Sequence, residues 1–255
     1  MRNIRSYLSI SGITVMRRII GTLWIIAITL IALGCATTGK GAIFSGTPIA
    51  LVSVVSNYDI NWKGEEPTSS SVVSDAIRRI MRANEDWVIV TKADIIIDEA
   101  EEIIRSSLEK SPQVTLAPKE DVFNARSYNE ARLNTNQANG QMVKPAGYRM
   151  VFHRDKNFFP NFAKETGIDK TLFITLDLTK EMSSGIGKNG SYRGRATMTV
   201  LLKDMRGKDL FNKIYEVPSR DNAKVTSGAY SQEELLELLR SAINDACLDF
   251  LDDLK

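Results

Sequence analysis

The stretch NFAKETGIDKTLFITLDL, residues 161–178, contains a short helical pattern that is followed without a linker by a strand pattern. Gly167 is expected directly after the helix, in the left-handed conformation that commonly ends helices. Residues 171–178 are rich in Thr, Ile and Leu, which predicts a strand. Because a helix buries its apolar stripe against a neighbouring element, this unit predicts a fold in which helices pack on a sheet.

Five further elements are expected before this stretch, and strands and helices are interleaved among them. Residues 48–55 form a short β-branched run that predicts a buried strand, and residues 87–90 and 113–117 predict two more strands. Residues 71–83 and 94–110 place apolar side chains at spacings of three and four residues, as amphipathic helices do.

A hairpin and a long helix are expected to close the chain. Residues 192–203 and 210–217 predict two strands joined by the tight turn DMRGK. Ser231 and Glu234 have the spacing of a capping box that starts the last helix. The inward stripe of that helix is expected to comprise Leu235, Leu239, Ala242, Ala246 and Phe250. The order of elements therefore predicts the α/β class, with a mixed sheet and helices packed on it.

The 255 residues, 43% of them hydrophobic, suffice for one well-filled core and an appendage. We expect a signal peptide at residues 1–34, a tether at 35–46 and a single α/β domain at 47–255. Within the domain, residues 124–157 are interpreted as a polar insertion. Its first part, residues 124–144, is rich in Asn and Gln and contains the turn signal Asn-Gly, so it is predicted to be an exposed helix and loop.

The N-terminal segment has the layout of a secretory signal. Arg17 and Arg18 precede an apolar run, residues 19–34, that carries no charge. The run is shorter than the roughly 20 residues that a membrane-spanning helix needs. An uncleaved membrane anchor is the alternative. Both Met1 and Met16 are candidate starts. A start at Met16 would give a signal of ordinary length and would make residues 1–15 an upstream extension from a misplaced start codon.

This segment resembles the lipobox of bacterial lipoproteins. Gly34 precedes Cys35, and Ala32 stands where leucine is more usual. The resemblance implies cleavage between Gly34 and Cys35, with acyl chains such as palmitate on Cys35. Two or more chains anchor a protein durably in a membrane. Ala36 follows instead of the Asp that retains lipoproteins in the inner membrane, so the resemblance favours the outer membrane, with the domain facing the periplasm.

The charge balance argues against a nucleic-acid partner. The chain has 33 basic and 31 acidic side chains, and four of the arginines precede Cys35. The mature chain would keep 29 basic against 31 acidic residues, which is not the clustered excess that phosphate binding needs. With only Cys35 and Cys247 present, at most one disulfide could form. Cys247 is expected on the apolar face of the last helix, as a buried free thiol.

The residues offer little catalytic or cofactor-binding chemistry. His153 is the only histidine, and no Gly-x-Ser-x-Gly motif accompanies it. One histidine and one available cysteine cannot form a zinc set, whereas a carboxylate-only Ca²⁺ or Mg²⁺ site stays open. The acidic run 98–102 is interpreted as the solvated face of its helix. We therefore expect no cofactor and no enzymatic activity.

The glycine-rich segment GIGKNG, residues 185–190, matches Gly-x-Gly-x-x-Gly. A dinucleotide site needs this motif between a strand and a helix, but a strand pattern follows it here. We interpret it as a hairpin tip. The neighbouring cations could touch an acidic partner, and the candidate contact residues are Lys188, Asn189, Arg193 and Arg195.

Two segments resemble periplasmic lipoproteins of the CsgG, LpoB and TolB-N-terminal-like group. The matching positions are Ala163, Glu165, Gly167 and Asp169 before the strand, then Leu202, Asp204 and Gly207 in the hairpin. The resemblance covers roughly residues 42–255. It implies an α/β sandwich domain that makes protein contacts in the cell envelope and has no active site.

We therefore expect a lipid-anchored envelope protein whose periplasmic domain is a non-catalytic binding or assembly module. The expected partners are an envelope protein or a peptidoglycan component, and assembly with itself is also considered. Two alternatives stay open. One is a cell-wall enzyme with a carboxylate site, and the other is a subunit of an oligomeric export channel.

Overall fold

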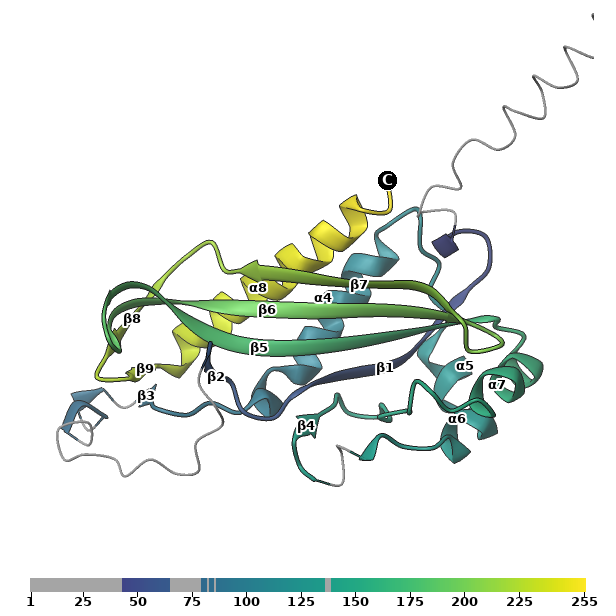
Figure 1. Ribbon diagram of the computed structural model, residues 1–255, viewed down its shortest axis with the longest axis horizontal. Coiled ribbons are helices and arrows are strands. Elements are labelled where there is room, and N and C mark those ends of the chain that lie inside the picture. Colours follow the sequence, from purple (N-terminus) through teal and green to yellow (C-terminus); the bar gives the residue numbers. More distant parts are fainter. Residues whose placement is uncertain (1–42, 65–78, 82, 85, 136–138) are drawn as a thin grey trace, which may run out of the picture. The chain divides into compact units, whose positions relative to one another are not determined.

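The computed structural model describes residues 43–64, 79–81, 83–84, 86–135 and 139–255, and its fold is the predicted α/β class (Figure 1). The described residues form one nine-stranded mixed sheet in the order β3-β9-β8-β6-β5-β1-β4, with β2 also paired to β5 and β7 to β6. The strands are β1 (Ile49–Asn57), β2 (Asn61–Trp62), β3 (Trp87–Val88), β4 (Met142–Val143), β5 (Lys170–Ile186), β6 (Asn189–Asp204), β7 (Asp209–Pro218), β8 (Ala223–Thr226) and β9 (Ala229–Ser231). The helices are the 3₁₀ turn η1 (Ala93–Ile95), α4 (Ile97–Glu109), α5 (Lys119–Phe123), α6 (Arg126–Glu130), α7 (Phe158–Thr166) and α8 (Gln232–Asp252).

The long hairpin of β5 and β6 is the centre of the sheet. The two strands stay in antiparallel register from Lys170 opposite Asp204 to Ile186 opposite Asn189. The predicted strand 171–178 is confirmed, and β5 runs on for eight residues beyond it, to Ile186. Gly167 ends α7 with a φ of 73°, which confirms its predicted left-handed conformation. The predicted turn between β6 and β7 is also confirmed, because Gly207 N donates to Asp204 O.

Helices α4 and α8 cover one face of the sheet and enclose the main core (Figure 1). Ser231 is confirmed as the N-cap of α8, because its side chain accepts a hydrogen bond from Glu234 N at 3.3 Å, which is one of the two bonds of the predicted capping box. The five side chains predicted for the inward stripe of α8 are all buried. Cys247 lies beside them as a buried free thiol, as predicted.

A second, smaller core covers one end of the opposite face. Phe158, Phe159 and Phe162 of α7 pack there with Phe173 of β5 and with Tyr128 of α6. The prediction of an exposed helix and loop at residues 124–144 is confirmed only in part. The segment contains helix α6 and most of its described residues are exposed, but Ala125, Tyr128 and Ala131 are buried, with Tyr128 only 1% exposed. The few apolar side chains of this segment are separated by polar ones. Amino-acid composition alone therefore does not indicate that they point toward the same core.

Two smaller predictions need correction. Residues 113–117 do not form a strand, because they reach only the first residue of β1, through one parallel bridge between Leu116 and Ile49. Glu101, which was placed on a solvated face, is 3% exposed. It accepts hydrogen bonds from Lys119 Nζ at 2.7 Å and Tyr148 Oη at 2.8 Å, so distant parts of the chain satisfy its charge.

The predicted signal, the lipobox residues Gly34 and Cys35 and most of the predicted helix 71–83 lie outside the described residues. Among the helices that the structure describes, none combines the length and the apolar character needed to cross a membrane.

Candidate functional site

On the face opposite the main core, part of the sheet is not covered by any of the helices that the structure describes. Along β5, Leu176, Leu178 and Lys180 point into the main core, so the residues between them point to the other side. In Figure 1, α4 and α8 lie behind β5, β6 and β7, while α5, α6 and α7 gather at one end. We call the uncovered part the open face. Its side chains are Thr175, Asp177, Thr179 and Glu181 of β5, Arg193, Arg195, Thr197 and Thr199 of β6, and Asn212, Ile214 and Glu216 of β7.

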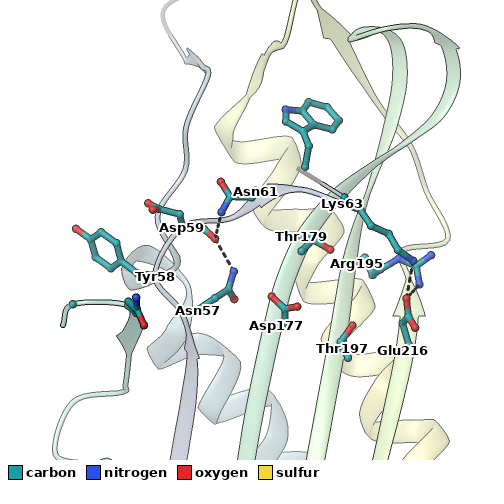
Figure 2. Close-up of a pocket in the computed structure, with 14 residues that line it drawn as sticks. Asn57, Tyr58, Asp59, Asn61, Lys63, Asp177, Thr179, Arg195, Thr197 and Glu216 are labelled. Carbon is teal, nitrogen blue, oxygen red and sulfur yellow. Dashed lines mark hydrogen bonds and ion pairs between the residues drawn. The ribbon is translucent and has the colours of Figure 1, made fainter. Parts of the chain in front are cut away.

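A polar groove of about 680 Å³ crosses the open face (Figure 2). Its floor is formed by strand residues, and its rim by the segment that connects β1 to β2 and by the turn before β4. The groove is lined by Asn57, Tyr58, Asp59, Asn61, Trp62, Lys63, Gly64, Gly140, Gln141, Asp177, Thr179, Arg195, Thr197 and Glu216. These described lining residues include no histidine, serine or cysteine.

Asn57 fixes the rim of the groove to its floor. At the end of β1, its Nδ2 donates to Leu178 O at 2.9 Å and to Asp59 O at 2.6 Å. Its Oδ1 accepts from Leu178 N at 2.7 Å. The single amide side chain of Asn57 thereby hydrogen-bonds to backbone groups of both β5 and the rim. The positions of Tyr58 and Asp59 on the rim therefore depend on it.

Asp177, Thr197 and Glu216 form one cross-strand row on the groove floor. Asp177 pairs in register with Thr197, and Thr197 with Glu216. Glu216 accepts from Lys63 Nζ at 2.8 Å and from Arg195 Nη1 at 2.7 Å, and these cations hold the pKa of its carboxyl below the ordinary value. Desolvation in the groove, and secondarily the charge of Glu216, raise the pKa of Asp177. The row therefore presents one neutralised carboxylate, Glu216, and one carboxylate, Asp177, that has no ion pair with the described residues.

The four candidate contact residues do not form a single loop. Lys188 and Asn189 lie at the turn of the β5–β6 hairpin, where Asn189 Oδ1 accepts from Ser227 N at 2.7 Å and Lys188 Nζ lies 5.6 Å from the centre of the Trp62 ring. Arg195 lies in the groove, with its guanidinium 2.6 Å from Glu181. Arg193 also faces Glu181, at 3.4 Å. Only Arg195 belongs to the groove.

The glycines of residues 185–190 serve the backbone of the hairpin tip. A Cβ on Gly185 would lie 2.0 Å from Asn189 O, and one on Gly190 would lie 2.3 Å from Ser184 O. No side chain fits at either position. The interpretation of this segment as a hairpin tip is confirmed, because its residues join β5 to β6.

His153 borders a separate cavity of about 300 Å³, farther along the same face. Burial, with the positive charges of Lys203 and Arg154, lowers the pKa of its imidazole. Burial also raises the pKa of the Cys247 thiol to about 12, which keeps it protonated at neutral pH. Among the described residues there is no group of three or more His, Cys, Asp or Glu placed to hold a metal ion.

Asp177, Glu216 and Asn57 were not singled out from the sequence. The available signal was the alternation in DLTKEM, residues 177–182, where polar side chains occupy every second position beyond the predicted strand. That alternation indicates a strand with one solvated face, but it does not indicate which other strands contribute to the face.

No protein-family model matches the chain, and no curated protein matches it. Among solved structures, the chain is similar to the C-terminal domain of LpoB from Salmonella enterica, with 9% identity and a TM-score of 0.26 over 68% of this chain and 83% of that one. It is also similar to the hypothetical protein CT253 from Chlamydia trachomatis, with 10% identity and a TM-score of 0.29 over 69% and 73% of the two chains. At these TM-scores neither likeness supports a conclusion about function.

Proposed function

We propose that this chain is a lipid-anchored protein of the bacterial outer membrane whose α/β domain is a periplasmic binding module. The anchoring part of the proposal rests on the lipobox pattern around Cys35. The binding part rests on one observation, the groove on the open face with its ordered row of Asp177, Thr197 and Glu216. Concave sites with a few convergent polar groups are where proteins commonly hold ligands.

The groove suits a ligand with many hydrogen-bonding groups. Amide side chains stand at its rim, threonine hydroxyls lie on its floor, and Tyr58 and Trp62 border it. Glu216 forms ion pairs with Lys63 and Arg195, which hold these two side chains in place. Because they are already ordered, less side-chain conformational entropy is lost when a ligand binds. The carboxylate of Asp177 adds an acceptor for an amine or a hydroxyl. Peptidoglycan carries both groups, so we propose it as the ligand.

The anchor is tested by the intact mass and N-terminal peptide spectrum of the protein extracted from its own membranes. We expect the chain to begin at an acylated Cys35, and the Cys35→Ser variant to lose the lipid and leave the membrane fraction. An unmodified Cys35 within an uncut chain would refute the lipoprotein assignment and indicate a membrane-spanning anchor.

The binding function is tested by co-sedimentation of the detergent-purified full chain with purified peptidoglycan sacculi. We expect binding that weakens at least several-fold in Asp177→Asn and in Arg195→Gln. Asp121→Asn, which changes an exposed carboxylate on α5 outside the groove lining, is the matched control. Equal sedimentation of all four proteins would show that the groove is not the site.

A second candidate function, a cell-wall hydrolase, is favoured by the opposite pKa shifts of Asp177 and Glu216. Two carboxyl groups with separated pKa values are the pattern of a general acid and a general base. Their strands, β5 and β7, lie two strand spacings apart, about 9.5 Å between backbones. Inverting glycosidases separate their two carboxyl groups by about 6.5–9.5 Å. Release of soluble fragments from sacculi, abolished by either Asp177→Asn or Glu216→Gln, would establish an enzyme in place of a binding module.

A further inference from the structure

We propose that the outer edge of β7 is an interface between two copies of this chain, in which the two β7 strands pair antiparallel about a two-fold axis at Ile214. The resulting dimer would join the two sheets into one. This inference goes beyond the proposed groove function and does not depend on it.

Strand β7 is a long edge strand of the described sheet. It has ten residues, and along its inner edge Arg195 to Lys203 of β6 pair with Pro218 to Asp209. No strand in the described part of the chain pairs with its outer edge, and in Figure 1 the strand borders the sheet. A long edge of this kind presents a row of backbone N–H and C=O groups that can pair with another strand.

Ile214 gives this edge an apolar centre. Its side chain is 60% exposed, although the other large apolar side chains of the strand's middle, Phe211 and Tyr215, are 8% and 6% exposed. It stands on the open face, opposite Thr199 of β6. A β-branched side chain at the middle of an edge strand packs well against the same side chain of a paired strand.

The sequence of β7 is complementary to itself in this register. A two-fold axis at Ile214 places Ile214 opposite its own copy, Asn212 opposite Glu216, and Lys213 opposite Tyr215, with no like charges directly opposed. An axis at Lys213 would oppose two lysines, and an axis at Glu216 would oppose two carboxylates, both of which destabilise a pair. An axis at Tyr215 would place Ile214 opposite the charged Glu216.

The charges that could keep a second strand away are already paired within one copy. Lys213 Nζ lies 2.9 Å from Asp253 Oδ2, and Glu216 pairs with Lys63 and Arg195. Lysines on edge strands ordinarily discourage edge-to-edge pairing through their free charge. Because the charge of Lys213 is paired with Asp253, it should not repel a second strand from the backbone of β7. An identical β7 strand, which is complementary in charge in this register, is therefore the partner that we propose.

Disulfide trapping tests the register. The full chain is made with Cys35→Ser and Ile214→Cys, while the remaining Cys247 is 2% exposed. Opposite residues of an antiparallel pair have Cα atoms about 4.5–5.5 Å apart, within the range that a disulfide spans. Mild oxidation should therefore give a covalent dimer at Ile214→Cys, at least ten-fold faster than at Val90→Cys, a matched control with 59% exposure. Equal rates at the two positions would overturn the proposed interface.

Sedimentation equilibrium of the full chain with native Ile214 tests the dimer without a cross-link. We expect a dimer that becomes a monomer in Ile214→Lys and stays a dimer in Ile214→Val and in Val90→Lys. Circular dichroism confirms that each variant is folded. A native chain that stays monomeric at the highest concentration measured would refute the proposal, as would an Ile214→Lys variant that remains dimeric.

Discussion

Asp177 and Glu216 lie in one cross-strand row, separated by Thr197, yet the pKa values of their carboxyl groups move in opposite directions. The cause is local. Glu216 has Lys63 and Arg195 within 2.8 Å, whereas Asp177 is partly desolvated and feels the negative charge of Glu216. The same row therefore contains one carboxylate that favours folding when charged and one that opposes it.

The first prediction concerns the pH dependence of stability. The raised pKa of Asp177 means that its charged form costs folding free energy above the folded pKa, so Asp177→Asn should raise the urea midpoint at pH 7. The lowered pKa of Glu216 means that its stabilising contribution is present at neutral pH and is lost as the pH falls through the folded value. Glu216→Gln should therefore lower the midpoint at pH 7.

Near pH 3, below the ordinary aspartate pKa of about 4, the difference for Asp177→Asn should vanish. The difference for Glu216→Gln should shrink there but persist until the pH lies below the lowered folded pKa of Glu216. The measurement is urea denaturation of the wild type and the two variants at both pH values. Midpoint shifts of the same sign for the two substitutions at pH 7 would contradict the assigned environments.

The second prediction concerns the buried carboxylate of Glu101. Burial pushes its pKa upward, but hydrogen bonds from Lys119, Tyr148 and Arg105 outweigh burial and lower it. Glu101→Gln should cost about 3 kcal/mol at pH 7, because Arg105, with 12% of its side chain exposed, would lose its buried counterion. This cost should shrink as the pH falls through the lowered folded pKa, since the protonated wild type also loses the charge.

Two matched variants separate the charge from the other contacts of this network. Tyr148→Phe removes the hydrogen bond that Tyr148 donates to Glu101 and the one that it accepts from Arg105, and should cost about 2 kcal/mol. Glu109→Gln removes the other carboxylate partner of Arg105. The Glu109 side chain is 54% exposed and its Oε1 lies 3.4 Å from Arg105 Nη1, so this substitution should change the free energy of unfolding by less than about 0.5 kcal/mol. If Glu109→Gln proved as damaging as Glu101→Gln, burial would not explain the effect.

The third prediction concerns the contact between β6 and α8. Gly194 lies under the helix, and a Cβ there would stand 3.1 Å from backbone atoms of Leu238 and Leu239. Gly194→Ala should destabilise the domain by about 1–3 kcal/mol, because the helix must move outward. Ser191→Ala on the same strand should stay within about 0.5 kcal/mol. Equal midpoints for the two variants in thermal unfolding would mean that the helix shifts at no cost.

The fourth prediction concerns the thiol of Cys247. It is 2% exposed, and burial raises its pKa to about 12, so the reactive thiolate is scarce at neutral pH. In a Cys35→Ser chain, Ellman's reagent should titrate no thiol in the folded protein within an hour and one thiol in guanidinium chloride. Rapid reaction of the folded chain would show that the C-terminal helix opens readily.

Local patterns were sufficient for several elements of the fold. The spacing of apolar residues identified α8, Ser231 and Glu234 identified its start, and Gly167 identified the end of α7. These signals succeed because they act through hydrogen bonds and side-chain contacts within a few residues. Local patterns failed for Glu101 and Tyr128. The partners of Glu101, Lys119 and Tyr148, are 18 and 47 positions away in the sequence, and the partner of Tyr128, Arg149, is 21 positions away.

The sequence by itself determined the alternation of helices and strands, the caps and turns between them, and the expectation of a lipid anchor at Cys35, because each depends on neighbouring residues. Only the tertiary structure decided which face of the sheet stays open. That choice depends on where α5, α6 and α7 pack, since these helices cover Phe173 but leave Asp177 and Glu216 uncovered. It also depends on the pairing of β7 with β6, which brings Glu216 into the row with Asp177.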